Sequence, residues 1–304
     1  MNRYRSIFLY CTIILLFGIP ASQEAKEPKV YKYQLSITAI FRDDARFLRE
    51  WIEFHRMVGV EHFYLYNNLS KDDYQSVLKP YIQEGLVELI QWPRDSYEIH
   101  GWSVIQNESY TDALKRSRGK TKWLAIIDTD EFLFPVQHDD LVSVLNEYDR
   151  FGGVGANWQM FGTSNVQRIP EDGLMIENLL MRAEDDYSDH NYVKSIVRPE
   201  RVVRCGNPHF VLYQKNYFSV NENKQAIKGR KSPYVSVNKL RINHYWTRDE
   251  DFFHDVKLER ERKFKRNLEF CTNKKEEINQ VYDDVILRFV PELNGQMFVE
   301  EVAR

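Results

Sequence analysis

Short apolar runs and amphipathic segments follow one another along the first half of the chain. Residues 34–41 (QLSITAIF) are rich in apolar and β-branched side chains, which is typical of a buried strand. Residues 47–58 carry large apolar side chains at spacings of three and four, so one face of a helix is apolar, and Gly59 is expected to end it. The same pattern predicts strands at residues 62–66, 86–92 and 123–127, and helices at residues 72–84 and 104–116.

Four strands separated by helices of this length predict right-handed crossovers and a parallel sheet covered on both faces. Ligands bind beyond the carboxyl ends of the strands in such sheets, which draws attention to residues 42–44, 67–68 and 128–130. In the less regular second half we expect strands at residues 154–161, 193–197 and 210–213, and a charged helix at residues 251–268. The expected fold class is therefore α/β, with a mainly parallel sheet, flanking helices and a single domain over residues 31–304.

The amino-terminal segment has the pattern of a targeting sequence. Arg3 and Arg5 precede an apolar run over residues 7–19, and a polar stretch follows Ala21. The run is shorter than the roughly 20 residues that span a bilayer. Residues 1–22 are therefore predicted to be a secretory signal peptide, with an uncleaved signal anchor as the alternative. Either would send the protein into the secretory pathway, as a soluble exported protein or as a membrane-anchored one.

Composition narrows the function classes. The chain has 304 residues and a net charge of −3, which disfavours a nucleic-acid-binding protein because such surfaces are strongly basic. Aromatic residues make up 14% of the chain, which fits a cleft that stacks ring-shaped ligands. Three cysteines exclude a disulfide-dense scaffold. Cys205 and Cys271 would remain in an exported chain, either paired or free.

The strongest chemical signal is WLAIIDTDEFLFP at residues 123–135. Asp128 and Asp130 follow a buried strand, and residues two apart on an extended segment point to the same side. Such carboxylates suit Mg²⁺ or Mn²⁺, and a metal there can neutralise a diphosphate leaving group. The alternative is a solvated acidic strand end. Glu131 is interpreted as a neighbour that faces a turn or helix.

Several ordered motifs resemble glycosyltransferases of family 92 and related family-2-like enzymes. They are ITAIFRDDARFLREWIEFHRMVGVEHFYLYNN, WLAIIDTDEFLFP, NWQMFGTSN, VKSIVRP and NHYWTRDEDFFHDVKLER. The resemblance covers residues 33–262 and implies a GT-A (Rossmann-like) fold, a nucleotide-sugar donor, a divalent metal (Mn²⁺ or Mg²⁺) and inversion at the anomeric carbon. It suggests a UDP-hexose donor, with galactose as the family precedent.

The resemblance also implies nucleotide contacts at the ends of the first two strands. Residues 39–42, ending at Arg42, resemble the uracil and ribose contact, whereas Asp44 departs from the family's usual Arg-Asn-Glu pattern. Asn67 resembles a second nucleoside contact, with a turn-forming Asn in a left-handed backbone as the alternative. Asp128 matches the diphosphate and metal motif.

Metal ligands implied by the resemblance are Asp128, Asp130 and His244, the last within RINHYW. His209 is the next candidate, and the histidines interpreted as structural or superficial are His55, His138 and His190.

Lys257 and Arg260 lie three residues apart and would share a helical face that clamps a diphosphate. Glu261 stands where the family usually has Gly. The alternative is a solvated, ion-paired helix face, because opposite charges interleave along this segment.

Trp158 and Phe161 precede a glycine turn and suit an acceptor-sugar platform, with core packing as the alternative. An inverting transferase also needs a general base to deprotonate the acceptor hydroxyl. Acids between the two strands at residues 154–161 and 193–197 are the candidates, and we favour Asp185 among them. The full set is Glu171, Asp172, Glu177, Glu184, Asp185, Asp186 and Asp189.

The sequence thus predicts an inverting, metal-dependent hexosyltransferase that acts on a UDP-sugar donor and a glycan or glycoconjugate acceptor. It lacks the GxSxG, GxxxxGK[ST] and GxGxxG motifs of other chemistries. Asp128 and Asp130 are too close together to flank a glycosidic bond as a hydrolase requires. The remaining alternatives are a non-catalytic carbohydrate-binding protein on the same fold and a nucleotidyltransferase.

Overall fold

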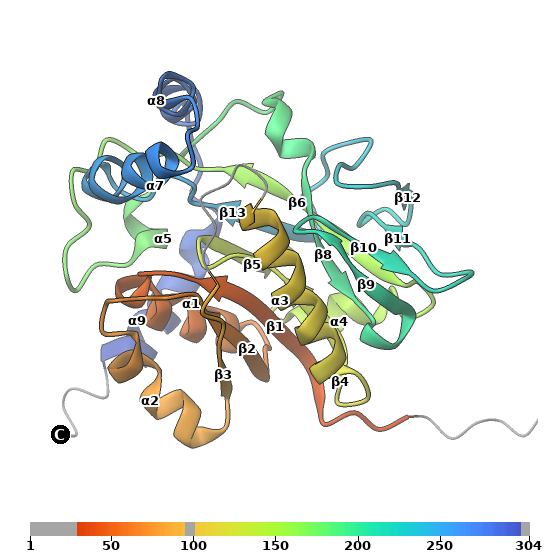
Figure 1. Cartoon of the computed structure of the whole chain (residues 1–304). Coiled ribbons are helices and arrows are strands. Elements are labelled where there is room, and N and C mark those ends of the chain that lie inside the picture. Colours follow the sequence, from red (N-terminus) through yellow and green to blue (C-terminus); the bar gives the residue numbers. More distant parts are fainter. Residues whose placement is uncertain (1–28, 95–100, 299–304) are drawn as a thin grey trace, which may run out of the picture. The chain divides into compact units, whose positions relative to one another are not determined.

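The computed structural model describes residues 29–94 and 101–298 (Figure 1). Residues 31–304 form one compact unit. The predicted targeting segment, residues 1–22, lies outside the described residues, so its role stays a prediction. Within the described ranges, no helix combines the length and the apolar character needed to cross a membrane.

Parallel strands form the first half of the central sheet. The elements are β1 (Tyr33–Phe41), α1 (Ala45–Met57), β2 (His62–Asn67), α2 (Tyr74–Glu84), β3 (Val87–Gln91), α3 (Gly101–Ser117) and β4 (Thr121–Ile126). β1 lies between β2 and β4 and pairs with both in parallel. β2 also pairs with β3 in parallel. Gly85 ends α2 with a φ of 79°, a conformation that glycine adopts readily. Each of these elements was expected from the hydrophobic pattern.

The second half adds strands of both directions. The elements are β5 (Glu131–Pro135), α4 (Leu141–Asn146), β6 (Gly153–Met160), β8 (Val193–Val197), β11 (Ser219–Val220), β12 (Ala226–Ile227) and β13 (Leu240–His244). β8 runs antiparallel between β4 and β6, while β6 is parallel to β11 and β13. The ten-stranded sheet is therefore mixed but mainly parallel, and the predicted α/β class is confirmed.

Smaller elements surround this sheet. β10 and β9 form one two-stranded sheet, and β14 and β7 form another. The elements are α5 (Met175–Asn178), β7 (Met181–Arg182), η1 (Ser188–Asn191), η2 (Pro199–Arg201), β9 (Val202–Asn207), β10 (Phe210–Tyr213), α6 (Glu250–Phe252), η3 (Phe253–Lys257), α7 (Leu258–Lys263), α8 (Leu268–Glu277), β14 (Val281–Tyr282), η4 (Val285–Phe289) and α9 (Val290–Phe298).

Apolar clusters cover both faces of the sheet. Along β4, Trp123 and Ala125 join the cluster that contains α1, α2 and α4, whereas Leu124 and Ile126 join the cluster that contains α3. This alternation follows from the period of two in a strand. Figure 1 shows α3 lying across one face of the sheet, with α1 on the other side of the strands. Because both faces of the sheet are covered, the ends of its strands are where a ligand can reach it.

The charged helix expected at residues 251–268 is not continuous, so that prediction is wrong in its length. A π-helical turn, η3, separates α6 from α7, and α7 ends at Lys263. Lys265 has a φ of 54°, which a continuing helix does not allow. Asn267 then caps α8 by accepting a hydrogen bond from the Phe270 amide.

Both cysteines of the described chain are free and buried. Cys205 lies on β9 and its thiol donates to the carbonyl oxygen of Asn207 at 3.1 Å. Cys271 lies on α8. The alternative of a Cys205–Cys271 disulfide is therefore wrong for this structure.

Candidate functional site

The acidic turn joins β4 to β5 at the carboxyl end of the central strands. Asp128 and Asp130 keep 28% and 20% of their side chains exposed, whereas Thr129 and Glu131 are buried. The Tyr245 amide donates to the Asp130 carbonyl at 2.8 Å and ties the turn to the end of β13. The predicted position of both aspartates after a buried strand is confirmed.

Asp128 is surrounded by donors from the protein itself. Its Oδ1 accepts from the Tyr110 hydroxyl at 2.7 Å and from Gln106 Nε2 at 2.9 Å, both on α3. Its Oδ2 accepts from Lys194 Nζ at 2.6 Å. Both carboxylate oxygens therefore already have partners in the folded chain.

Lys194 is a fully buried cation and the second residue of β8. Its ammonium lies 3.3 Å from Glu131 Oε1 in addition to its bond with Asp128. Burial opposes the charge, but the nearby carboxyl groups raise the pKa of Lys194 above its ordinary value. Burial also raises the pKa of Glu131 well above its ordinary value, with Lys194 acting against it.

Asp130, Glu131 and His244 form a group that suits a divalent cation. His244 Nε2 lies 3.6 Å from Asp130 Oδ1, and His244 Nδ1 lies 3.9 Å from Glu131 Oε1. One ligand atom from each residue falls within 4.8 Å of the others. Among the described residues, His244 Nδ1 is buried without a hydrogen-bond partner, and Glu131 Oε1 accepts no hydrogen bond, although the Lys194 ammonium pairs with it at 3.3 Å. Burial lowers the pKa of His244, which favours the neutral ring that metals bind.

The predicted ligands Asp130 and His244 are thus brought together. Asp128 lies beside them, but it is not a member of this group among the described residues. Glu131, interpreted from sequence as a mere neighbour, belongs to it.

Arg42 and Arg260 meet at the carboxyl end of β1. Arg42 donates from Nε to the Asn68 carbonyl at 2.7 Å and from Nη2 to Asn68 Oδ1 at 2.5 Å. Arg260 Nη2 donates to the Arg42 carbonyl at 3.2 Å. Two cations from distant parts of the sequence therefore border the strand end where a nucleotide was expected.

Lys257 carries a positive charge that interacts with Asp130 of the acidic turn. Its ammonium lies 4.5 Å from the centre of the Trp246 ring. Burial lowers the pKa of Lys257 to about 8, with the charge of Asp130 acting against it. Lys257 ends the π-helical η3 and Arg260 lies in the first turn of α7, so the shared diphosphate-binding face expected for this pair stays a prediction.

Asn67 acts within its own turn. Its Nδ2 donates to the Tyr74 hydroxyl at 2.9 Å and to Gln91 Oε1 at 2.8 Å, while its Oδ1 accepts from the Ser70 amide at 3.1 Å. The side chain is buried. These contacts favour the turn-forming interpretation, although the left-handed backbone falls at Leu69, with a φ of 62°, rather than at Asn67.

Asp44 has a role that the sequence did not reveal. It forms a buried ion pair with Arg248 at 2.6 Å and accepts a hydrogen bond from the Thr129 hydroxyl at 2.9 Å. Thr129 stands between the two aspartates of the acidic turn. Asp44 therefore anchors that turn to the start of α1.

Both predicted acceptor residues are buried in the same apolar core cluster, but their neighbours differ. Trp158 lies beside the site, with its ring centre 4.5 Å from that of His244 and 4.9 Å from that of His209. Phe161 is fully buried and packs against Tyr245. The placement of Phe161 favours the core-packing alternative.

His209 belongs to this aromatic group. Burial lowers the pKa of its ring to about 3, and its Nδ1 lies 3.2 Å from the Val193 carbonyl. His55 bridges the Trp51 carbonyl and the Leu133 amide, and His190 accepts from the Met160 amide, so both are structural as expected.

Asp185, favoured as the general base, has 90% of its side chain exposed and pairs with Arg182 at 2.8 Å. The structure records no contact between Asp185 and the acidic turn within the described residues. Asp189 is bound to Lys274 at 2.7 Å. The other candidate acids of this region are exposed: Glu171, Asp172, Glu177, Glu184 and Asp186.

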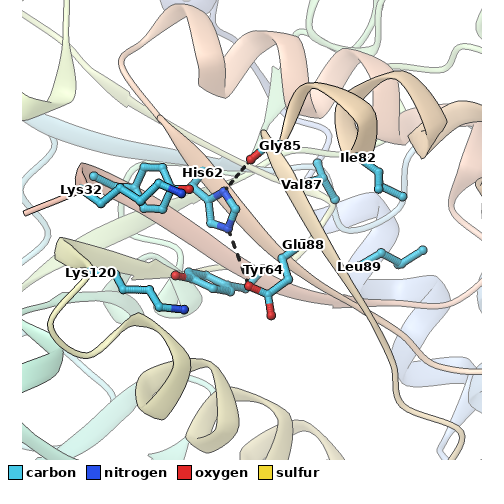
Figure 2. A pocket seen from close by; sticks show the side chains of 10 residues that line it. Lys32, His62, Tyr64, Ile82, Gly85, Val87, Glu88, Leu89 and Lys120 are labelled. Carbon is cyan, nitrogen blue, oxygen red and sulfur yellow. Dashed lines mark hydrogen bonds and ion pairs between the residues drawn. The ribbon is translucent and has the colours of Figure 1, made fainter.

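A cavity of about 710 Å³ lies at the opposite end of the strands from the acidic turn, next to the amino-terminal ends of β1, β2 and β3 (Figure 2). His62 occupies its centre, stacked on Tyr33 at 4.4 Å and bonded to the Gly85 carbonyl at 3.1 Å. Ligands of parallel sheets bind at the opposite edge. We therefore assign the functional site to the acidic turn rather than to this cavity.

Comparison with known proteins identifies the family of the chain. A family model described as Glycosyltransferase family 92 matches residues 32–289. The chain belongs to glycosyltransferase family 92. The matched range of this family 92 protein includes the acidic turn, Lys194 and His244, as well as the residues that line the cavity around His62.

Relatives of this family 92 protein include a glycosyltransferase family 92 protein of Oryza sativa subsp. japonica, 28% identical over 217 residues, which are 70% of this chain and 33% of the relative. The beta-1,4-galactosyltransferase galt-1 of Caenorhabditis elegans is 27% identical over 209 residues, which are 66% of this chain and 48% of the relative. The chain therefore spans less than half the length of either.

Among solved structures, TarS of S. aureus matches with 13% sequence identity and a TM-score of 0.35, over 55% of this chain and 47% of the TarS chain. A likeness of this size carries no conclusion about function.

Proposed function

We propose that this family 92 protein transfers a hexose from a UDP-hexose to a glycan hydroxyl, with inversion and with the help of Mn²⁺ or Mg²⁺. The observation that carries the proposal is the group formed by Asp130, Glu131 and His244, whose ligand atoms lie within 4.8 Å of one another at the carboxyl edge of the sheet. Galactose is the favoured sugar, because relatives of the chain are named as galactosyltransferases.

Asp130, Glu131 and His244 would hold the metal, with Asp128 beside them. A divalent cation supplies positive charge that stabilises a diphosphate as it leaves. Oxygen and imidazole ligands of this kind suit Mn²⁺.

Cations of the chain would bind the rest of the donor. Lys257 and Arg260 would neutralise the diphosphate, and Arg42, whose carbonyl accepts a hydrogen bond from Arg260, would contact the nucleoside at the end of β1. Trp158 offers an indole close to His244 for a sugar ring. The acceptor hydroxyl would attack the anomeric carbon while a carboxylate takes its proton, and Asp185 stays the predicted base.

We also propose that residues 1–22 send the chain into the secretory pathway, as a signal peptide or as an anchor. Glycan and glycoconjugate acceptors would be met there. Expression of the full chain, followed by amino-terminal sequencing of the exported product, distinguishes the two. A mature start near Gln23 indicates cleavage, whereas a cytosolic, uncleaved product would contradict the proposal.

A transfer assay tests the function. The purified full chain is incubated with Mn²⁺, a panel of UDP-hexoses and β-1,4-linked galactan oligosaccharides, and the products are read by mass spectrometry and NMR. We expect a mass increase of one hexose, a β-anomeric signal from an α-linked donor, and at least about a hundredfold loss of rate in Asp130→Asn, equal to about 2.7 kcal/mol of lost stabilisation. Release of pyrophosphate instead of UDP would contradict the proposal and indicate a nucleotidyltransferase.

A further inference from the structure

The contacts of Asp128 distinguish it from its neighbour Asp130. Three protein donors point at the Asp128 carboxylate, at 2.6 Å, 2.7 Å and 2.9 Å. Asp130 instead faces His244 across 3.6 Å. The two carboxylates of this short turn therefore have different partners: protein donors for Asp128 and the His244 ring for Asp130.

Lys194 is fixed in its place. Its side chain is fully buried on a central strand, and its ammonium contacts Asp128 at 2.6 Å and Glu131 at 3.3 Å. The Trp158 ring covers it at 5.8 Å. Separation of the Lys194–Asp128 ion pair would leave the buried ammonium without this carboxylate, which is costly in free energy.

Lys194 also adjoins the metal group without belonging to it. It touches Glu131, whose carboxyl group belongs to the metal group, and it also binds Asp128, which does not belong to that group among the described residues. A residue that orients a ligand in this way determines which side chains reach the metal.

We propose that Lys194 is a built-in counter-cation that holds the Asp128 carboxylate away from the metal, so that a divalent cation is bound by Asp130, Glu131 and His244 and not by Asp128. This inference rests on the proposed metal site and specifies its ligands. Lys194 is a positioning residue, since it acts through Asp128 and Glu131.

Metal binding by single variants gives the first test. Mn²⁺ is titrated into the full chain by calorimetry, and Co²⁺ is added as a spectroscopic probe because its visible bands report the ligand set. Asp128→Asn is expected to change the Mn²⁺ dissociation constant by less than about threefold, since only a neighbouring charge is lost, and to leave the Co²⁺ bands in place. Asp130→Asn is expected to raise the Mn²⁺ dissociation constant by about tenfold or more and to shift the visible Co²⁺ bands.

Removal of the counter-cation gives the second test. In Lys194→Met the Asp128 carboxylate loses its cation, and Asp128→Asn added to this variant is expected to weaken Mn²⁺ binding by about tenfold or more. Lys194→Arg keeps the positive charge. In that background Asp128→Asn is expected to change Mn²⁺ affinity as little as it does in the unmodified chain. Lys239→Met is the matched control, because it removes an exposed ion pair with Glu147, 2.7 Å long, outside the site.

The outcomes separate the inference from the function on which it rests. If the unmodified chain binds Mn²⁺ and Asp128→Asn loses as much affinity as Asp130→Asn, Asp128 is a ligand and the inference is overturned while the metal site stands. If the unmodified chain binds neither Mn²⁺ nor Co²⁺, the proposed metal site and the inference fail together. The Asp128→Asn comparison does not need Lys194→Met to fold, so it decides the matter alone if that variant is unstable.

Discussion

Replacement of Asp44 by alanine is expected to destabilise the protein through a buried cation. Asp44 and Arg248 have 6% and 3% of their side chains exposed, and the pair is 2.6 Å long. Asp44→Ala would leave Arg248 without its anion inside the fold. It would also release the Thr129 hydroxyl, which donates to Asp44 at 2.9 Å.

The expected magnitude follows from these two losses. Removal of one partner from a buried ion pair costs about 3–5 kcal/mol, because the remaining charge is left uncompensated. Loss of the Thr129 hydrogen bond adds about 1 kcal/mol. The sum is a large part of the about 5–15 kcal/mol that stabilises a typical domain.

Urea unfolding followed by tryptophan fluorescence measures the effect. The matched variant is Asp44→Ala combined with Arg248→Met, because the Arg248 guanidinium lies 4.1 Å from the Phe47 ring centre and 4.4 Å from that of Phe252, where an apolar side chain can pack. We expect the double variant to be more stable than Asp44→Ala. A loss below about 1 kcal/mol in Asp44→Ala, or a double variant less stable than the single one, would refute the reasoning.

Three further predictions concern the rest of the fold. Burial raises the pKa of Glu50 from 4.5 to about 7, so its proton stabilises the folded state fully below pH 4.5 and this contribution is lost as the pH rises through about 7. Glu50→Gln should remove about 3 kcal/mol of pH dependence in the free energy of unfolding, measured by urea titrations across that range. Gly295→Ala should stabilise α9 by up to about 1 kcal/mol in thermal melts, because a methyl group meets open space, whereas Gly162→Ala should destabilise by about 1–3 kcal/mol, because its Cβ would lie 2.7 Å from the Ile278 carbonyl oxygen. Phe161→Ala should lower the free energy of unfolding by about 3–5 kcal/mol in the same melts. A negligible change in stability would contradict core packing and favour Phe161 as an acceptor contact.

The regular part of the fold was predictable because its signals are local. Strands β1 and β4 are mainly apolar and almost wholly buried, the α1 segment has one apolar face, and a glycine closes α2. The position of Asp128 and Asp130 at a strand end followed from the same pattern. The break at Lys265 was not predictable in this way, because the charges around it fit a longer helix equally well.

The contacts inside the site depend on residues far apart in the sequence. Lys194 lies 66 residues from Asp128, and only the tertiary fold brings β8 beside β4. One signal was available, since a lysine inside the apolar strand VKSIV must find a buried anion. For Asn67 a sequence offers the residue type but not its neighbours, so a turn contact and a nucleotide contact have the same pattern.

Calorimetric titration of the full chain with UDP, in the presence and absence of Mn²⁺, measures whether the acidic turn binds a nucleotide through a metal. We expect UDP binding that requires Mn²⁺ and that weakens by about tenfold or more in Asp130→Asn, while Lys239→Met binds as the unmodified chain does. UDP binding that is equally strong without metal, or equally strong in Asp130→Asn, would contradict the assignment of the acidic turn as the site of a metal-dependent glycosyltransferase.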